Sequence, residues 1–286
     1  MTYRHIYAAI ELQSSNTVVI ERADRLAKRC GARLTVATCV PDLKALYRGT
    51  EHRMQEDFDH TMVTAAEQDL AALCQKARVT PERLEVVRGE PEVSIVVDAH
   101  QRRADLLAFG NHDRHGLDHY VGGFGLGLLH RAHCDLLAVN LAHADVTFAS
   151  PLAALADDDD DAKVLRRTLD LSRSVCAAVH VLRPPWLQAW SSDMAQAEER
   201  TNIATKIRTQ LAERLAELAS VDLQVTFDTP SRGIEAAAEQ GQHDLIVMGS
   251  GSHSQLGWHL GSTAHNLLSL TRRDVLLIRP AQIREG

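Results

Sequence analysis

The sequence contains no long apolar run and no excess of basic residues, and these two absences narrow its possible functions. Its longest apolar stretches fall well short of the roughly 20 residues that a helix needs to cross a bilayer. The formal net charge is −7, whereas proteins that bind a nucleic-acid backbone need a clustered positive surface. With 45% hydrophobic and 24% charged residues, the composition is that of an ordinary folded protein. We therefore expect neither a membrane nor a nucleic acid as a partner.

The cysteines are few, odd in number and never spaced as CxxC. All five lie singly in apolar contexts: Cys30, Cys39, Cys74, Cys134 and Cys176. This pattern indicates reduced core residues rather than disulfides or a metal centre. The segment from Met1 to Tyr7 leads into a strand pattern without a basic and apolar leader, which argues against secretion. Both features predict a cytoplasmic protein.

The sequence repeats itself at a fixed offset. ADLLAFG at 104–110 returns as HDLIVMG at 243–249, and CDLLAVN at 134–140 returns as RDVLLIR at 273–279. The members of each pair are 139 positions apart, as are Pro91 and Pro230. A fixed offset of this size indicates duplicated domains, and each half has the usual size of one domain. We predict one domain over 1–145 and a second over 146–286, with His143 to Ser150 as the linker.

Each half alternates short apolar runs, which are typical of buried strands, with segments of helical periodicity. In the first half we expect strands at 4–12, 33–40, 84–88, 105–109 and 135–140, and helices up to 30, within 43–77, at 92–101 and at 124–131. In the second half we expect strands at 152–156, 178–182, 223–227, 244–248 and 275–278, and helices at 163–174, 194–219, 233–239 and 262–269. Such alternation produces a parallel sheet covered on both faces. The predicted fold class is α/β, with two doubly wound, Rossmann-like, five-stranded domains in tandem.

The loop after the fourth strand of the second half is rich in glycine and hydroxyl groups. It runs from Gly249 to Thr263 and opens a helix. Ligands of open parallel sheets bind at the carboxyl ends of the strands where the strand order reverses, and this loop begins there. Glycines let a phosphate approach the backbone, and a helix amino terminus supplies N–H groups and a positive dipole end. Ser262 and Thr263 add hydroxyl donors, so the pattern favours a phosphate site.

At this loop the chain resembles the universal stress protein family. YRHIYAAIELQSSNT, DLLAFGNHDRHGL, DLIVMGSGSHSQLGWHLGSTAHNLL and DVLLIRP all stand in that family's order and spacing. Its nucleotide-binding members carry G-x2-G-x9-G-[ST] after the fourth strand, an aspartate at the end of the first strand that meets the adenine, and a valine near the end of the second. The resemblance implies an adenine-nucleotide site in the second half, formed by Asp157, Val181, Met248, Gly249, Gly251, Ser252, Gly261, Ser262 and Thr263.

The glycine loop of the second half is one residue shorter than the family pattern. Counted forward from Gly249, the second glycine falls on Ser252, with eight residues between it and Gly261. Counted back from Gly261, Gly251 takes that place and Met248 replaces the first glycine. Both alignments remain open.

The corresponding loop of the first half departs further from the family pattern. It keeps only Gly110 and Gly122, and Gly123 stands where the family has a hydroxyl residue. Asp113 and Asp118 would place negative charge beside a phosphate. The resemblance here is to the branch of the family that does not bind ATP, so we expect no nucleotide in this half.

Other polar clusters invite alternative interpretations. His112, His115 and His119 match no standard metal spacing, so no metal site is expected. The run from Asp157 to Asp161 stands at a helix start, where carboxylates suit the free N–H groups and the dipole. Five like charges would call for a divalent ion such as Mg²⁺ on any bound triphosphate. The sequence shows no catalytic spacing of paired carboxylates, of Ser-His-Asp or of Cys-His, which predicts that the protein has no catalytic residues.

Together these features predict a tandem universal stress protein that acts as a non-catalytic regulatory or protective module, with ATP or another adenine nucleotide in its second half. The alternatives are a nucleotide-free scaffold that binds an unknown protein partner and, less favoured without a general base, a slow ATPase. The last strand of each half would form a sheet edge, and edges invite pairing. The resemblance implies dimers that form through this edge. We therefore expect the halves to form an internal pseudo-dimer, and a homodimer of whole chains is also open.

Overall fold

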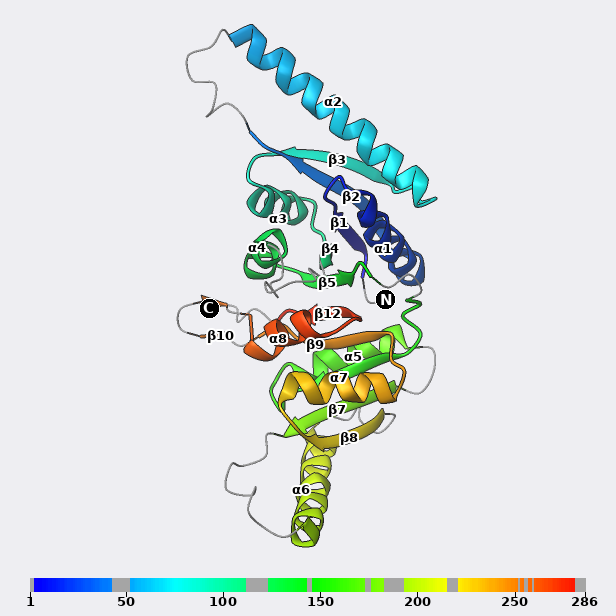
Figure 1. Cartoon of the computed structure of the whole chain (residues 1–286), viewed down its shortest axis with the longest axis vertical. Helices are drawn as coiled ribbons and strands as arrows, with labels where there is room; N and C mark the ends of the chain where they lie inside the picture. The colour runs from blue at the N-terminus through cyan, green and yellow to red at the C-terminus, as the bar shows by residue number, and fades with distance from the viewer. Residues whose placement is uncertain are drawn as a thin grey trace. The chain divides into compact units, whose positions relative to one another are not determined.

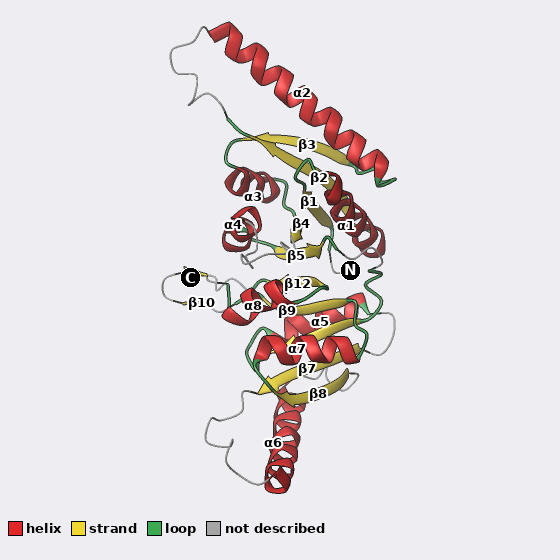
Figure 2. Cartoon of the chain, in the orientation of Figure 1, coloured by secondary structure: helices red, strands yellow, loops and turns green. Residues whose placement is uncertain are grey.

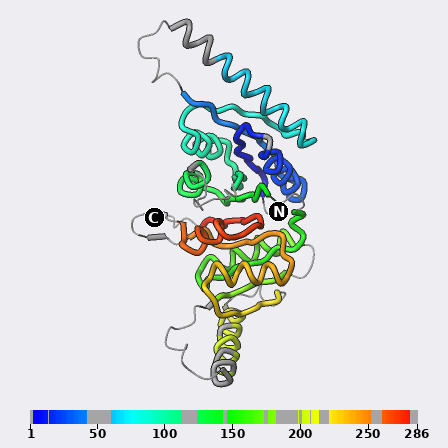
Figure 3. Tube along the Cα trace, in the orientation of Figure 1, coloured from blue at the N-terminus to red at the C-terminus, as the bar shows by residue number. Residues whose placement is uncertain are grey.

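The computed structural model describes residues 3–42, 52–111, 123–142, 146–172, 176–182, 193–214, 221–251, 253–254, 257–258 and 260–280. The chain divides into two compact units, 1–144 and 145–286, which run from blue to green and from green to red in Figures 1 and 3. Part of the predicted linker, residues 143–145, lies outside the described residues. Among the helices that are described, none is long and apolar enough to cross a membrane.

The first domain alternates strands and helices along its whole length. Its elements are β1 (His5–Ala9), the short 3-10 helix η1 (Ser14–Asn16), α1 (Thr17–Cys30), β2 (Arg33–Val40), α2 (His52–Lys76), β3 (Arg83–Arg88), α3 (Pro91–Gln101), β4 (Leu106–Asn111), α4 (Gly123–Arg131) and β5 (Asp135–Asn140). The strands pair in parallel in the order β3-β2-β1-β4-β5. Helices α1 and α2 pack together, as do α3 and α4, and the two pairs cover opposite faces of the sheet (Figure 2).

The second domain repeats this arrangement. Its elements are β6 (Pro151–Leu155), α5 (Asp161–Leu171), β7 (Cys176–Leu182), α6 (Asp193–Arg214), β8 (Val221–Phe227), α7 (Pro230–Gln240), β9 (Leu245–Gly249), α8 (Ser262–Leu270) and β12 (Asp274–Ile278). The strands are parallel in the order β12-β9-β6-β7-β8. A small antiparallel pair that the sequence did not predict, β10 (His253–Ser254) with β11 (Gly257–Trp258), lies within the glycine loop. The predicted fold class, two doubly wound parallel-sheet domains in tandem, is confirmed.

Burial of the sheet on both faces explains why its strands read as continuous apolar runs. Every residue of β1, β5, β6 and β12 is buried. Helix α1 instead buries one side, on which the apolar residues recur at helical spacing, namely Val19, Ile20, Ala23, Leu26, Ala27 and Cys30. The first strand is shorter than predicted, because the chain leaves the sheet after Ala9 and turns into η1.

A repeated aspartate ties the start of the first strand to the start of the fourth. In the first domain the Asp105 carboxylate accepts backbone N–H bonds from Arg4 and His5, both at 2.9 Å. In the second domain Asp244 accepts four bonds at 3.0–3.1 Å. Its donors are the backbone N–H groups of Thr147, Ala149 and Ser150 and the hydroxyl of Thr147. Because bonds to a carboxylate are stronger than neutral ones, this contact explains why aspartate recurs in ADLLAFG and HDLIVMG.

Replacing Asp244 with asparagine should destabilise the second domain by about 1–3 kcal/mol, because the amide NH₂ would face backbone donors that then lack an acceptor. The thermal midpoint of unfolding measures the effect, and hydrogen exchange of the β6 and β9 amides locates it. Asp222→Asn, at an exposed position of β8, is the matched control. Equal midpoints for the two variants would show that the contact does not matter.

A second buried contact at the start of β1 involves an imidazole. His5 is 5% exposed, with Nε2 2.9 Å from Thr35 Oγ1 and Nδ1 3.1 Å from the Arg102 carbonyl oxygen. A carbonyl can only accept, so Nδ1 carries the hydrogen and the neutral ring accepts from the Thr35 hydroxyl through Nε2. Burial, the main cause, lowers the pKa of His5 below its ordinary value of 6.5.

The lowered pKa of His5 predicts that the first domain loses stability in acid. The unfolded chain binds a proton on this imidazole as the pH falls below about 6.5, while the folded domain resists it, so protonation favours unfolding. The contribution is complete above that pH and is lost as the pH falls through the folded pKa. Hydrogen exchange of the slowest β1 amides at pH 7.5 and 5.5 measures it. His5→Asn should show a smaller loss between these pH values than the parent, and an equal loss would contradict the assignment.

Candidate functional site

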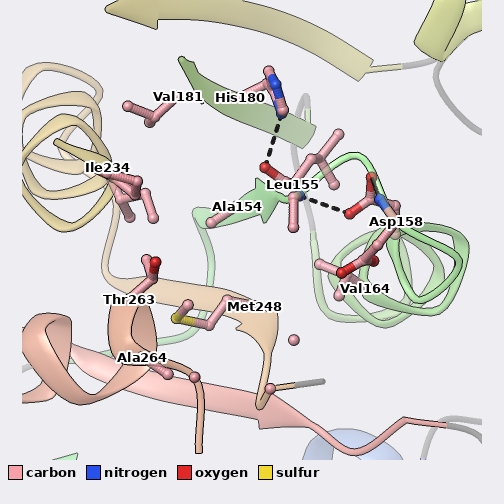
Figure 4. Close-up of a pocket in the computed structure, with 16 residues that line it drawn as sticks. Ala154, Leu155, Asp158, Val164, His180, Val181, Ile234, Met248, Thr263 and Ala264 are labelled. Atoms are coloured by element: carbon pink, nitrogen blue, oxygen red, sulfur yellow. Dashed lines mark hydrogen bonds between the residues drawn. The ribbon is translucent and has the colours of Figure 1, made fainter. Parts of the chain in front are cut away.

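A cavity of about 340 Å³ opens at the carboxyl ends of β6 and β9 in the second domain. These strands are neighbours at the point where the strand order reverses, because the chain continues from β6 toward β7 on one side and from β9 toward β12 on the other. Strands β6, β7 and β9 and helices α5, α7 and α8 contribute its walls (Figure 4). The cavity therefore occupies the place where doubly wound folds bind ligands.

One part of the cavity is apolar. Val181 of β7, Ile234 of α7 and Met248 of β9 line it (Figure 4). Met248 is 6% exposed, and its unbranched thioether adapts to the faces and edges of aromatic rings. Val164 of α5 lines the cavity from another side. These side chains can enclose a flat, largely apolar ring.

The turn between β6 and α5 brings carboxylates to the cavity. Asp161 is 1% exposed, and its two oxygens accept the backbone N–H groups of Ala156, Asp157 and Asp158 at 2.9, 2.9 and 3.3 Å. Asp158 accepts the backbone N–H of Asp160 at 3.0 Å. Asp158 and Asp161 both line the cavity. We expected this acidic run to cap the N–H groups at the start of α5. Instead, Asp161 accepts from N–H groups of the turn that precedes the helix, and the N-cap residue Asp160 makes no side-chain cap.

His180 gives the cavity a polar group on its β7 side (Figure 4). The ring is 6% exposed, and its Nδ1 lies 3.0 Å from the carbonyl oxygen of Leu155. Because this oxygen can only accept, Nδ1 donates and Nε2 of the neutral ring keeps a lone pair. The contact also links β7 to the end of β6, where the acidic turn begins.

The glycine loop leaves the start of α8 open toward the cavity. Gly261 is the N-cap of α8 and has no side chain to cap the helix, so the N-cap residue offers no acceptor to the N–H groups of the first turn. Gly251 has a φ of +146°, a backbone conformation that side chains disfavour. A Cβ on Gly261 would lie 3.4 Å from the Gly251 Cα. Gly251, Gly261 and Thr263 all line the cavity.

The structure brings most of the predicted binding residues together. Those that line the cavity are Val181, Met248, Gly249, Gly251, Gly261 and Thr263. Two others do not line it: Asp157, which is exposed with a left-handed φ of 65°, and Ser262, which is exposed in the first turn of α8. Ser252 lies outside the described residues. Their roles in binding stay predictions.

Several residues that line this cavity were not among the predicted binding residues, and those with the clearest possible roles are Asp158, Asp161, His180 and Ile234. The strand of His180 reads as plain core, and nothing in its pattern distinguishes a buried imidazole that faces a ligand site. The sequence placed the carboxylates of the acidic run at the start of a helix. Only the geometry of the turn shows which of these carboxylates reach the cavity.

The loop of the first domain that contains His112, Asp113, His115, Asp118, His119 and Gly122 lies outside the described residues. Within the described ranges, no group of three or more histidine, cysteine, aspartate or glutamate side chains could hold a metal ion. All five cysteines are free thiols. Burial raises the pKa of Cys39, Cys74 and Cys176 to about 11, so these thiols stay protonated near neutral pH and are poor nucleophiles.

Comparison with known proteins agrees with the duplicated α/β architecture. The model of the family described as "Universal stress protein family" matches residues 2–140 and 152–279. The chain belongs to the universal stress protein family. Its two matched regions make it a tandem member, with one universal stress protein domain in each half.

Individual relatives match one half of this tandem universal stress protein. Universal stress protein A homolog 1 of Coxiella burnetii is 32% identical over 140 residues, which are 49% of this chain and 97% of that protein. Universal stress protein D of Escherichia coli K12 is 25% identical over 139 residues, which are 49% of this chain and 96% of that protein.

Solved structures match the whole tandem. A universal stress protein from Archaeoglobus fulgidus superposes with a TM-score of 0.63 at 18% identity, over 97% of this chain and 98% of that one. A protein of unknown function from Pseudomonas aeruginosa PAO1 superposes with a TM-score of 0.65 at 17% identity, over 97% of this chain and 93% of that one. At these identities the structures share the fold with this chain.

The two glycines at the end of β9 should respond differently to alanine. Gly251→Ala should destabilise the second domain by about 1–3 kcal/mol, because its positive φ strains any side chain. Gly249→Ala should leave stability nearly unchanged, since a Cβ there would meet nothing within 4 Å. Denaturant midpoints of the two variants measure the difference. A larger loss for Gly249→Ala would contradict the loop geometry.

Proposed function

We propose that this universal stress protein binds an adenine nucleotide in its second domain and acts in the cytoplasm as a non-catalytic regulatory or protective module. The observation that supports this most strongly is a cavity that joins apolar walls to the uncapped amino terminus of α8. Adenine nucleotides combine a flat ring with an anion, and the cavity offers a surface for each. A volume of about 340 Å³ falls in the usual range of ligand pockets.

In this proposal the adenine lies against Val181, Ile234 and Met248. The Nε2 lone pair of His180 would accept from the exocyclic amino group, which separates adenine from bases without such a donor. The phosphates would lie at Gly251, Gly261 and Thr263, where helix N–H groups and the dipole favour negative charge. The pairing of Gly251 with Gly261 favours the alignment in which Gly251 is the second glycine of the loop.

The carboxylates of the acidic turn mean that a bound triphosphate needs additional positive charge. Asp158 and Asp161 line the cavity, and no lysine or arginine is among its described lining residues. A triphosphate would therefore need compensation beyond the α8 dipole, and we propose a divalent ion such as Mg²⁺ on the phosphates. Figure 4 shows Asp158 and Thr263 on different walls, so the proposed phosphate end is separate from the acidic turn.

Among the described residues of the first domain, side chains lie close to the end of β4, which supports a nucleotide-free role for this domain. A Cβ on Gly110, at the end of β4, would lie 3.0 Å from Asn16 Oδ1 and 3.4 Å from both Leu141 methyl carbons. The equivalent space around Gly249 is empty to 4 Å. The side chains of the first domain therefore cover the position that the second domain leaves open.

The decisive experiment compares Gly261→Asp with Gly261→Asn. Aspartate and asparagine are similarly good N-caps and have nearly the same shape, so α8 should form in both variants. Only aspartate places a negative charge at the proposed phosphate position, which should weaken ATP binding by well over tenfold. Nucleotide released on denaturation, and ATP titration with Mg²⁺ by calorimetry, measure binding.

We expect binding by the parent, weaker binding by Gly261→Asn, whose amide oxygen competes with the phosphate for one N–H group, and loss of binding by Gly261→Asp, which adds a negative charge to that competition. Equal binding by both variants would contradict the phosphate position. No nucleotide and no ATP binding in the parent would contradict the proposal and favour a protein-binding scaffold. Release of more than one equivalent of ADP per chain would instead indicate an ATPase.

A further inference from the structure

A second cavity, of about 230 Å³, lies in the first domain at the opposite edge of the sheet from the switch point. It is bounded by the end of α3, by the residues after α4 and by the starts of β4 and β5. Helices α3 and α4 pack side by side (Figure 1). Its inner wall is apolar and comprises Val96, Ala99, Leu107 and Ala132. His100, Arg103, His133 and Cys134 form its rim.

The second domain fills the equivalent crevice with its own side chains. Glu235 and Arg273 stand 139 positions after Val96 and Cys134. Arg273 donates from Nε to the His243 carbonyl oxygen at 2.8 Å and forms an ion pair through Nη1 with Glu235. Both side chains are 19% exposed. An internal guanidinium and carboxylate therefore close this crevice in the second copy.

The first domain has lost both members of that pair. Valine replaces the glutamate and cysteine replaces the arginine, so nothing of comparable size enters the crevice and its wall carries no carboxylate to hold a cation. The crevice is therefore open in the first domain and filled in the second, and the second domain is the reference for this comparison.

The rim of the open crevice presents a guanidinium group and two imidazole rings. Arg103 is exposed with a left-handed φ of 55°, and its guanidinium has no hydrogen bond or ion pair with any described residue. The rings of His100 and His133 meet edge to face, with centroids 5.1 Å apart and planes at 61°. A fixed guanidinium charge beside the His100 imidazole, which has an N–H, suits an anion.

We propose that this crevice binds a small carboxylate with a compact apolar body. The carboxylate would pair with Arg103 and His100, and the apolar body would occupy the space that Arg273 fills in the second copy. The volume lies below the roughly 300–1,000 Å³ typical of sites for drug-sized molecules, so the crevice suits a molecule smaller than a nucleotide. The apolar wall disfavours bare phosphate, because burial of its polar oxygens there would leave them unpaired.

Benzoate is a suitable probe, and benzamide is its uncharged control of nearly the same shape. Amide shifts in ¹⁵N NMR spectra report binding, and the rate of Cys134 alkylation by iodoacetamide, followed by peptide mass spectrometry, reports occupancy. Benzoate should shift amides of the crevice and slow alkylation of Cys134. Cys39, which lies beside the Gly89 carbonyl on another strand, should be unaffected. Benzamide should produce neither effect.

Two variants test the chemistry of the crevice. Arg103→Gln should weaken benzoate binding about tenfold, as expected for loss of a bond to a charged group. Val96→Glu combined with Cys134→Arg restores the pair of the second domain and should abolish the amide shifts. Equal binding of benzamide and benzoate, or unchanged affinity in Arg103→Gln, would overturn the proposal. Arg103 is exposed, so its variant decides the matter even if the double variant does not fold.

Discussion

Each domain depends on one carboxylate at the start of its fourth strand, which binds the backbone where the first strand begins. Asp105 and Asp244 perform this task in the two copies. The strands they join are only five or six residues long. A contact that fixes the amino ends of two paired strands therefore also fixes where their carboxyl ends lie relative to each other. In the second domain that register places Ala154 opposite Met248, and the cavity opens just beyond them. The contact at the amino end thus determines the geometry of the carboxyl end.

The sequence was sufficient for the fold because its signals are local and strong. The strands at 33–40 and 135–140 have the predicted limits, since a strand buried on both faces is rich in apolar residues and is bounded by polar turns. The site was harder to predict because turns, rather than periodicity, determine it. Asp157 was expected at the ligand, and its role there stays a prediction, because Asp158 and Asp161 line the cavity whereas the exposed Asp157 does not. The short β10 and β11 pair was missed because four residues carry too little pattern.

Duplication explains how two copies of one fold can differ at both ends of the sheet. At the carboxyl edge, Asn16 and Leu141 approach Gly110 in the first copy, while the space beside Gly249 is empty. At the amino edge, Arg273 and Glu235 fill the second copy, while Val96 and Cys134 leave the first one open. A filled crevice contributes packing and a buried bond, whereas an open one leaves surface for a ligand. Among the described residues, each copy therefore has side chains that lie close at one end of the sheet and a cavity at the other.

The glycine at the start of α8 also lowers stability slightly while it leaves N–H groups available for binding. A serine or aspartate N-cap would satisfy one N–H of the first turn with its own side chain, and that oxygen would occupy the space where an external anion could bind. Glycine at Gly261 costs only a few tenths of a kcal/mol relative to those caps. Gly251 allows the neighbouring backbone to pass at a φ that other residues resist. The helix gives up a small part of its stability, and its first N–H groups stay available to a ligand that brings its own negative charge.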